Sequence, residues 1–107
     1  MKDPPQHPRP DDALKAIASP VRRKILAALS SPEQNFPGQE HPYAWGVCAG
    51  KIEAGCDLSQ STVSAHLAQL HQAGLLTAKK SGQWIFYKRD EAAITGLLTW
   101  LTRELQT

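Results

Sequence analysis

A short segment in the middle of the chain places small hydroxyl, amide and methyl groups on one side of a predicted helix. Val63, Leu67 and Leu70 recur at helical spacing, so the opposite side of this helix is expected to pack in a core. A helix whose exposed side lacks large charged groups can lie deep in a major groove, where Gln and Ser side chains hydrogen-bond to base edges. The residues expected to contact bases or phosphates are Gln60, Ser61, Thr62, Ser64 and Ala65.

The ends of this helix are marked by residues that favour helix boundaries. Ser59 is a favourable N-cap, and Gly74 can adopt the left-handed conformation that ends a helix, so the helix is predicted from about Gln60 to Ala73. Considered alone, a Ser- and Gln-rich exposed side is also typical of an ordinary amphipathic surface helix. The segment that follows decides between these two interpretations.

The residues after Gly74 favour a basic β-hairpin. Two β-prone runs, Leu75–Ala78 and Trp84–Tyr87, are separated by five residues that include a Ser-Gly pair, which is typical of a hairpin tip. The positively charged residues of this hairpin are Lys79, Lys80, Lys88 and Arg89. A helix with a polar side followed directly by a basic hairpin is the layout of a winged helix-turn-helix, in which the hairpin, or wing, contacts phosphates. The wing residues expected to bind phosphates are Lys79, Lys80 and Gln83.

Four segments form a specific signature when they are taken in this order and spacing. They are SPVRRKIL at Ser19–Leu26, LSQSTVSAHLAQL at Leu58–Leu70, AGLL at Ala73–Leu76 and GQWIFY at Gly82–Tyr87. Together they resemble the ArsR-type winged-helix transcriptional repressors of bacteria. The resemblance implies a homodimer whose first and last helices pair across a two-fold axis, and the symmetry predicts an operator of double-stranded DNA with an inverted repeat. It also implies that Arg22 ties helices together.

The predicted fold class is mainly α with a small β-hairpin, a winged helix-turn-helix of about five helices and a two-stranded wing that dimerises through its first and last helices. Residues 1–10 contain four prolines and are expected to be flexible, whereas residues 11–107 are expected to form one domain. Within it, the helix-turn-helix covers about 47–74, the wing about 75–89 and the dimerisation helix about 90–105. The last helix carries a narrow apolar stripe formed by Ile94, Leu97, Leu98, Leu101 and Leu105, with Trp100 beside it.

The segment Ser30–Trp45 contains three prolines and a glycine with no regular period, and it is therefore predicted to be a loop. It is longer than the connection typical of ArsR-type proteins, so the resemblance assigns it no role. Its aromatic residues Phe36, Tyr43 and Trp45 are unusual for a solvated linker. Two interpretations stay open: these side chains attach the segment to the domain, or they form an effector pocket or a subunit contact.

The two cysteines, Cys48 and Cys56, raise the question of metal binding. ArsR-type metal sensors often carry two cysteines two residues apart, in a CVCD motif, on the first helix of the helix-turn-helix, which is predicted here over Val47–Ala54. The matching residues of this chain read CAGK, so one cysteine and the acidic residue are missing. We therefore expect no metal site and no cofactor, and the alternative is a site built from His7, His41 and Cys48.

Thiol oxidation is a second possible chemistry, for which Cys48 and Cys56 are the candidate redox residues. Eight residues along a continuous helix correspond to ~12 Å, whereas a disulfide requires Cα atoms about 4.4–6.8 Å apart. Oxidation that joined the two thiols, or joined two subunits, would therefore distort the helix-turn-helix and release DNA. The alternative is that both are ordinary core cysteines.

The predicted function is a sequence-specific DNA-binding transcriptional regulator, a repressor released by a chemical signal such as thiol oxidation. The chain has no phosphate-binding glycine loop, HExxH motif or nucleophile elbow, so we expect no enzyme. No apolar run approaches the ~18 residues of a membrane span, and a cytoplasmic protein without a membrane partner is expected. The net charge of +2 leaves two alternatives open: a winged-helix protein-interaction module and a metal-responsive repressor.

Overall fold

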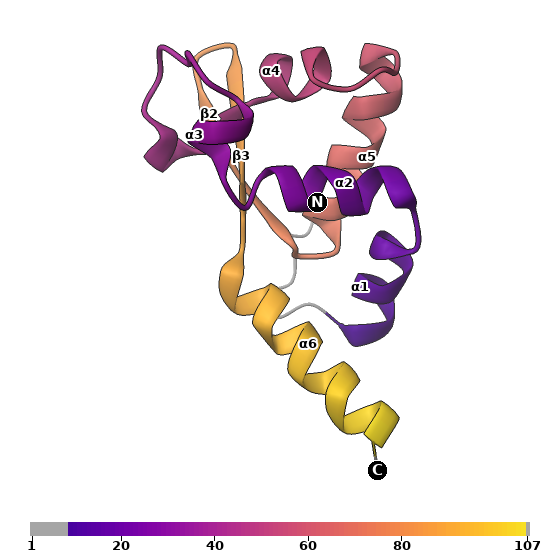
Figure 1. Cartoon of the computed structure of the whole chain (residues 1–107). Coiled ribbons are helices and arrows are strands. Elements are labelled where there is room, and N and C mark those ends of the chain that lie inside the picture. Colours follow the sequence, from indigo (N-terminus) through magenta and orange to yellow (C-terminus); the bar gives the residue numbers. More distant parts are fainter. Residues whose placement is uncertain (1–8, 107) are drawn as a thin grey trace.

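The structure confirms the predicted fold class, a mainly α winged helix. The computed structural model describes residues 9–106, and in this range six α-helices accompany a three-stranded antiparallel sheet with the strand order β1-β3-β2 (Figure 1). The helices are α1 (Pro10–Ile17), α2 (Pro20–Ala28), α3 (Pro32–Asn35), α4 (Ala49–Ala54), α5 (Gln60–Gln72) and α6 (Glu91–Gln106). The strands are β1 (Val47–Cys48), β2 (Leu76–Ser81) and β3 (Trp84–Arg89), and a 3₁₀ helix, η1, covers Tyr43–Trp45.

The predicted flexible N-terminus falls almost entirely outside the described residues. Only its last two residues, Arg9 and Pro10, are described, and Pro10 is already the first residue of α1. A proline suits this position because the first N–H groups of a helix have no intrahelical acceptor. The predicted domain boundary therefore lies one residue too late.

Helix α5 begins where the sequence predicts and ends one residue earlier than predicted. The Ser59 hydroxyl accepts a hydrogen bond from the Thr62 N–H at 3.2 Å, which is the expected N-cap interaction. At the other end, Gly74 has a φ of +81°, the left-handed conformation that stops a helix. These two residues fix the length of α5 and the direction in which the chain enters and leaves it.

The β2–β3 hairpin is longer than predicted. Ser81 pairs with Trp84, which leaves a two-residue turn instead of the predicted five-residue connection. The turn begins at Gly82, whose φ of +60° permits the tight turns that match the twist of the strands. Lys79 and Lys80 therefore lie within β2 rather than in the turn.

A third strand, β1, was not predicted. Its two residues pair with Tyr87 and Phe86 of β3, so the helix predicted over Val47–Ala54 begins only at Ala49. Gly46, directly before β1, explains this arrangement. Its φ is +108°, and a Cβ atom there would lie 2.5 Å from the Tyr87 carbonyl oxygen, so only glycine lets the chain approach β3 this closely.

The prediction that the aromatic side chains attach the segment Ser30–Trp45, hereafter the aromatic segment, to the domain is confirmed. The segment is not a plain loop, because it contains α3 and η1. The Trp45 ring packs edge-on against Phe86 at a centroid distance of 5.4 Å, and Phe86 is completely buried. Phe36 is also buried, and its carbonyl accepts a hydrogen bond from the Tyr43 hydroxyl.

Arg22 joins three helices, as the family resemblance implied. Its guanidinium donates hydrogen bonds to the carbonyls of Ala16 and Lys15 in the last turn of α1, the latter at 3.2 Å. It also bonds to Nδ1 of His66 in α5 at 3.1 Å. The Lys15 carbonyl also accepts from the Ala18 N–H, whereas carbonyls in the last turn of a helix, such as that of Ala16, lack an intrahelical donor, and Arg22 supplies one.

Replacing Arg22 with alanine is expected to lower the free energy of unfolding by about 2–3 kcal/mol, because partly buried hydrogen bonds from a charged donor are lost together. Urea denaturation measures this change. Arg23→Ala is the matched control, since the exposed Arg23 makes one hydrogen bond, to the Ile17 carbonyl. The control should lose under about 1 kcal/mol, and equal losses for the two variants would contradict the role given to Arg22.

Candidate nucleic-acid interface

The residues predicted to read DNA lie exposed on the N-terminal half of α5. This half consists of Gln60, Ser61, Thr62, Ser64 and Ala65, all exposed, together with Val63, which is completely buried. Ser61 and Ala65 lie roughly opposite Val63 on the helix. The exposed side is therefore made of short side chains without charge, and it can approach another surface closely.

The three hydroxyl groups at the start of α5 form a local cluster. The Ser59 hydroxyl lies 2.7 Å from that of Thr62 and 3.3 Å from that of Ser61. Because Thr62 is turned back toward the N-cap, its hydroxyl supports the helix end. The side chains of Gln60 and Ser64 form no hydrogen bond within residues 9–106. The first-turn N–H groups also favour negative charge, so this end of α5 suits a phosphate.

The register of the wing separates the two lysines that were predicted to act alike. Lys80 pairs with Ile85, and Lys79 pairs with Phe86, so the two lysines point to opposite faces of the sheet. Tyr87 lies on the same face as Lys80, and its ring lies 6.4 Å from the ring of His71 in α5. Lys80 therefore shares the face that packs toward α5, and Lys79 lies on the face covered by the aromatic segment.

Lys79 is held in an aromatic cluster on that second face. Its Nζ lies 5.2 Å from the centroid of the Trp45 ring, a cation–π arrangement. The His41 ring lies 5.0–5.8 Å from the rings of Phe86, Trp84 and Trp45. The sequence did not predict this cluster, because its members come from segments about 40 residues apart and no local pattern connects them.

The other basic residues of the wing are bound to the domain. Lys88 donates a hydrogen bond to the Ala44 carbonyl, and Arg89 bonds to the Leu26 carbonyl and pairs with Glu91 at the start of α6. Lys80 is exposed, and its side chain forms no hydrogen bond or ion pair with any residue from 9 to 106. Of the four wing cations, Lys80 is thus the one whose charge is most available to a phosphate.

The two cysteines lie at opposite ends of α4. Cys48 is the residue before the helix, and its N–H donates to Oε1 of Gln39 at 2.9 Å. Cys56 lies in the turn after the helix, half-buried, and burial raises the pKa of its thiol. Between residues 9 and 106, no three His, Cys, Asp or Glu side chains gather closely enough to hold a metal ion. His7 of the alternative metal site lies outside the described residues, and His41 belongs to the aromatic cluster.

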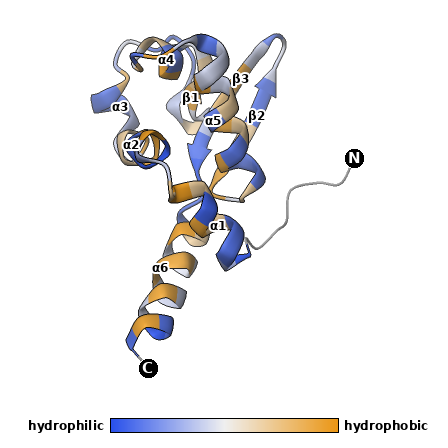
Figure 2. Cartoon of the chain, turned by 90° about the vertical axis from the view of Figure 1, so that its right-hand side faces the viewer, coloured by the Kyte–Doolittle hydropathy of each residue, from blue (hydrophilic) through white to orange (hydrophobic). Residues whose placement is uncertain are grey.

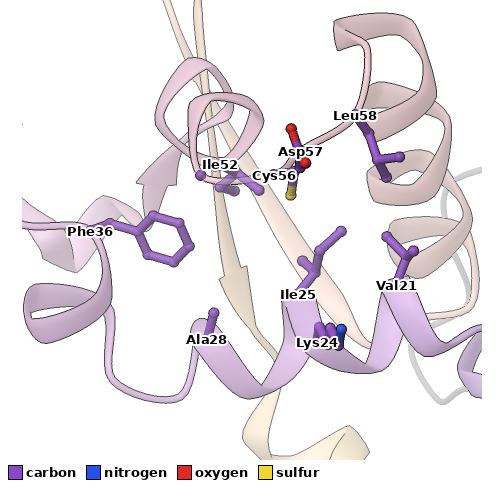
Figure 3. A pocket seen from close by; sticks show the side chains of 10 residues that line it. Val21, Lys24, Ile25, Ala28, Phe36, Ile52, Cys56, Asp57 and Leu58 are labelled. Atoms are coloured by element: carbon purple, nitrogen blue, oxygen red, sulfur yellow. The ribbon is translucent and has the colours of Figure 1, made fainter.

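A cavity beside the helix-turn-helix also escaped sequence analysis. Its volume is about 450 Å³, and it lies between α2, the end of α3, α4 and the turn that leads into α5 (Figure 3). Ile25 of α2 and Ile52 of α4 are both buried, and the cavity that they share depends on how the two helices pack. Such long-range packing has no signature in the local sequence.

Sequence and structure comparisons agree on the family. The family model for the bacterial regulatory protein arsR family matches residues 47–78. The uncharacterised HTH-type transcriptional regulator YbzH of Bacillus subtilis is 36% identical over 98 residues, which is 90% of this chain and 98% of YbzH. The transcriptional repressor SdpR of the same organism is 28% identical over 85% of this chain and 87% of SdpR.

A solved structure supports the same assignment. HlyU from Vibrio cholerae, a transcriptional activator, superposes with a TM-score of 0.61 at 29% identity and covers 87% of each chain. The structure has no helix long and apolar enough to cross a membrane in the part of the chain that it describes. The chain belongs to the ArsR family and is a DNA-binding transcriptional regulator.

Proposed function

We propose that the protein is a dimeric repressor that binds an inverted-repeat operator with the N-terminal half of α5 in the major groove and Lys80 on an adjacent phosphate. One observation carries this proposal. The exposed side of α5 is uncharged, and Lys80, the wing cation whose charge is most available, lies on the face of the sheet that packs toward α5. Gln60, Ser61 and Ser64 would contact bases or phosphates, and Ala65 would allow close approach to a thymine methyl. Thr62 and Lys79 would contribute mainly by positioning, whereas Gln83, in the two-residue turn of the wing, would contact a phosphate as the sequence predicts.

The last helix supports the dimer. In Figure 2, α6 leaves the body of the domain and carries a series of hydrophobic residues along its length. Leu98 is 59% exposed and Leu105 is 79% exposed, so this stripe has too little cover within one subunit. Pairing of α6, together with α1, across a two-fold axis would bury the stripe. The same axis would place two α5 helices about one turn of DNA apart.

Repression follows from occupancy of the operator, and a chemical signal would act by lowering that occupancy. SdpR is a repressor whereas HlyU is an activator, so the direction of regulation is a property of the operator position as well as of the fold. Thiol oxidation remains the proposed signal. The raised pKa of Cys56 favours its thiol form, which reacts more slowly with oxidants than the thiolate does.

Fluorescence anisotropy with DNA from upstream of the protein's own gene tests DNA binding. Because phosphate contacts release counterions, Lys80→Ala should weaken binding to specific and random DNA alike and reduce the salt slope by about one. Gln60→Ala should cost about 1–3 kcal/mol on the operator alone. Lys79→Ala is the matched control for charge, and it should change the salt slope less than Lys80→Ala does.

Two results would contradict this proposal. If Lys79→Ala weakened DNA binding more than Lys80→Ala did, the face of the wing that carries Lys79 would be the one that contacts DNA, contrary to this proposal. Binding that does not depend on salt, or no binding to DNA at all, would favour the competing function, a winged-helix module that binds another protein.

Leu98→Glu should convert the dimer to a monomer, because it places a charge in the centre of the proposed α6 interface. Sedimentation velocity measures the mass, and operator affinity should fall at least about tenfold once the two half-sites are bound independently. Thr99→Glu is the control, since Thr99 is exposed on the side of α6 away from the stripe. A dimer that survives Leu98→Glu would exclude this interface.

In a Cys48→Ser variant, the remaining thiol of Cys56 should react with iodoacetamide more slowly at pH 8 than it does in urea, since burial raises the pKa of this thiol. Mass spectrometry over a pH series measures the rate of alkylation, and the midpoint of the rate profile should lie at a higher pH in the native protein than in the unfolded protein.

Operator release by diamide should disappear when both cysteines are serine. A response that persists in the double variant would exclude a thiol signal.

A further inference from the structure

The cavity beside the helix-turn-helix has the size and lining of a small-molecule site. Its volume of about 450 Å³ falls within the range of about 300–1,000 Å³ that is usual for ligand pockets. Most of the lining is apolar, and Figure 3 shows the side chains of Ile25, Phe36 and Leu58 pointing toward the same space from three different elements. The cavity is therefore a partly open pocket bordered by α2, α4, the aromatic segment and the turn before α5.

The side chains around this cavity leave it unfilled and open to solvent on one side. Ile25 and Ile52 at its base are 4% and 1% exposed, whereas Leu58 is 43% exposed although it belongs to the turn of the helix-turn-helix. Ala28 lines the cavity from α2, and its small side chain leaves the space open. A ligand that filled this space would bury apolar surface on Leu58 and would gain free energy from doing so.

The charges in the lining indicate the class of ligand. Lys24 and Asp57 carry opposite charges, and neither side chain forms an ion pair or hydrogen bond with any residue from 9 to 106. Their charges cancel, so the cavity offers no net attraction to an anion or a cation, and each can still hydrogen-bond to a neutral polar group. The ring of Phe36 and the sulfur of Cys56 both favour contact with an aromatic ring.

We propose that this cavity is an effector site for a small uncharged aromatic molecule with one polar group, and that its occupancy changes the affinity for DNA. The regulatory part of this inference rests on the proposed DNA-binding function, whereas the binding part does not. A ligand in the cavity contacts the turn directly before the Ser59 N-cap of α5. It also contacts α2, whose Arg22 is bonded to His66 of α5. If the ligand binds one orientation of α5 more tightly than another, it raises the population of that orientation. The affinity for DNA, which depends on the orientation of α5, then changes as well.

The test uses 2-naphthol as the neutral probe, with 2-naphthoate and 2-naphthylmethylammonium as the charged analogues. In ¹H–¹⁵N NMR titrations of the full chain, 2-naphthol should shift the amides of Ile52, Gly55, Cys56 and Leu58 in a saturable manner. Both charged analogues should bind at least about fivefold more weakly than 2-naphthol. The carboxylate of 2-naphthoate would lie near Asp57, and the ammonium of 2-naphthylmethylammonium would lie near Lys24. Shifts that do not saturate, or that concentrate on the apolar stripe of α6, would overturn the proposal.

Two neighbouring alanines of α2 provide matched variants. Ala28→Trp should fill the cavity and weaken 2-naphthol binding at least tenfold, whereas Ala27→Trp, on the exposed side of the same helix turn, should change it less than twofold. Ala28→Leu fills less space and serves if the tryptophan variant does not fold. Unchanged binding in folded Ala28→Trp or Ala28→Leu would place the probe elsewhere.

Anisotropy with operator DNA then separates the two proposals. Saturating 2-naphthol should change operator affinity at least threefold in the wild-type protein and in Ala27→Trp but not in Ala28→Trp. Binding of DNA without binding of 2-naphthol would contradict the proposed effector site and would leave the proposed DNA-binding function intact. Binding of 2-naphthol without binding of DNA would contradict the proposed DNA-binding function alone. Binding of 2-naphthol that leaves the operator affinity unchanged would overturn the regulatory role of the site.

Discussion

Burial of one side of α5 is the interaction on which the arrangement of the rest depends. Val63, Leu67 and Leu70 are at most 1% exposed, and burying three such side chains contributes roughly 5–9 kcal/mol. A helix rotated about its axis would lose this contribution, so the same contacts that stabilise the domain also decide which side of α5 faces outward. The polar side at Ser61 and Ala65 is exposed as a consequence. Stability and the orientation of the surface proposed to contact DNA are therefore one constraint rather than two.

Two polar contacts and one glycine refine this orientation. The Ser59 cap fixes the first turn of α5, Gly74 turns the chain into β2, and the hydrogen bond from Arg22 to His66 connects the middle of α5 to α1 and α2. Each contact acts at a different position along the helix, so together they restrict both its rotation and its tilt. The proposed function requires this restriction, because in the proposed dimer two α5 helices would enter successive grooves of one duplex at a fixed separation.

Local patterns were sufficient for the features that are encoded locally. The spacing of Val63, Leu67 and Leu70, the Ser59 cap and the stop at Gly74 predicted α5 almost residue for residue, and the family signature supplied the winged helix. Features that depend on contacts between distant segments were missed. Strand β1 exists because Gly46 lets the chain approach Tyr87, about 40 residues away, and the different surroundings of Lys79 and Lys80 follow from their pairing with β3. The DNA contacts, the dimer and the signal remain predictions.

The strand order β1-β3-β2 leaves β2 with one open edge, along which backbone N–H and C=O groups have no neighbouring strand. Such an edge can template the addition of another chain, and lysines are among the residues that prevent this, because a second strand would have to bury or oppose their charges. Lys79 and Lys80 lie side by side on this edge strand and point to its two faces. The wing can therefore stay extended enough to reach a phosphate and yet resist edge-to-edge aggregation, and the same pair of charges would protect the solubility of the free protein before it finds DNA.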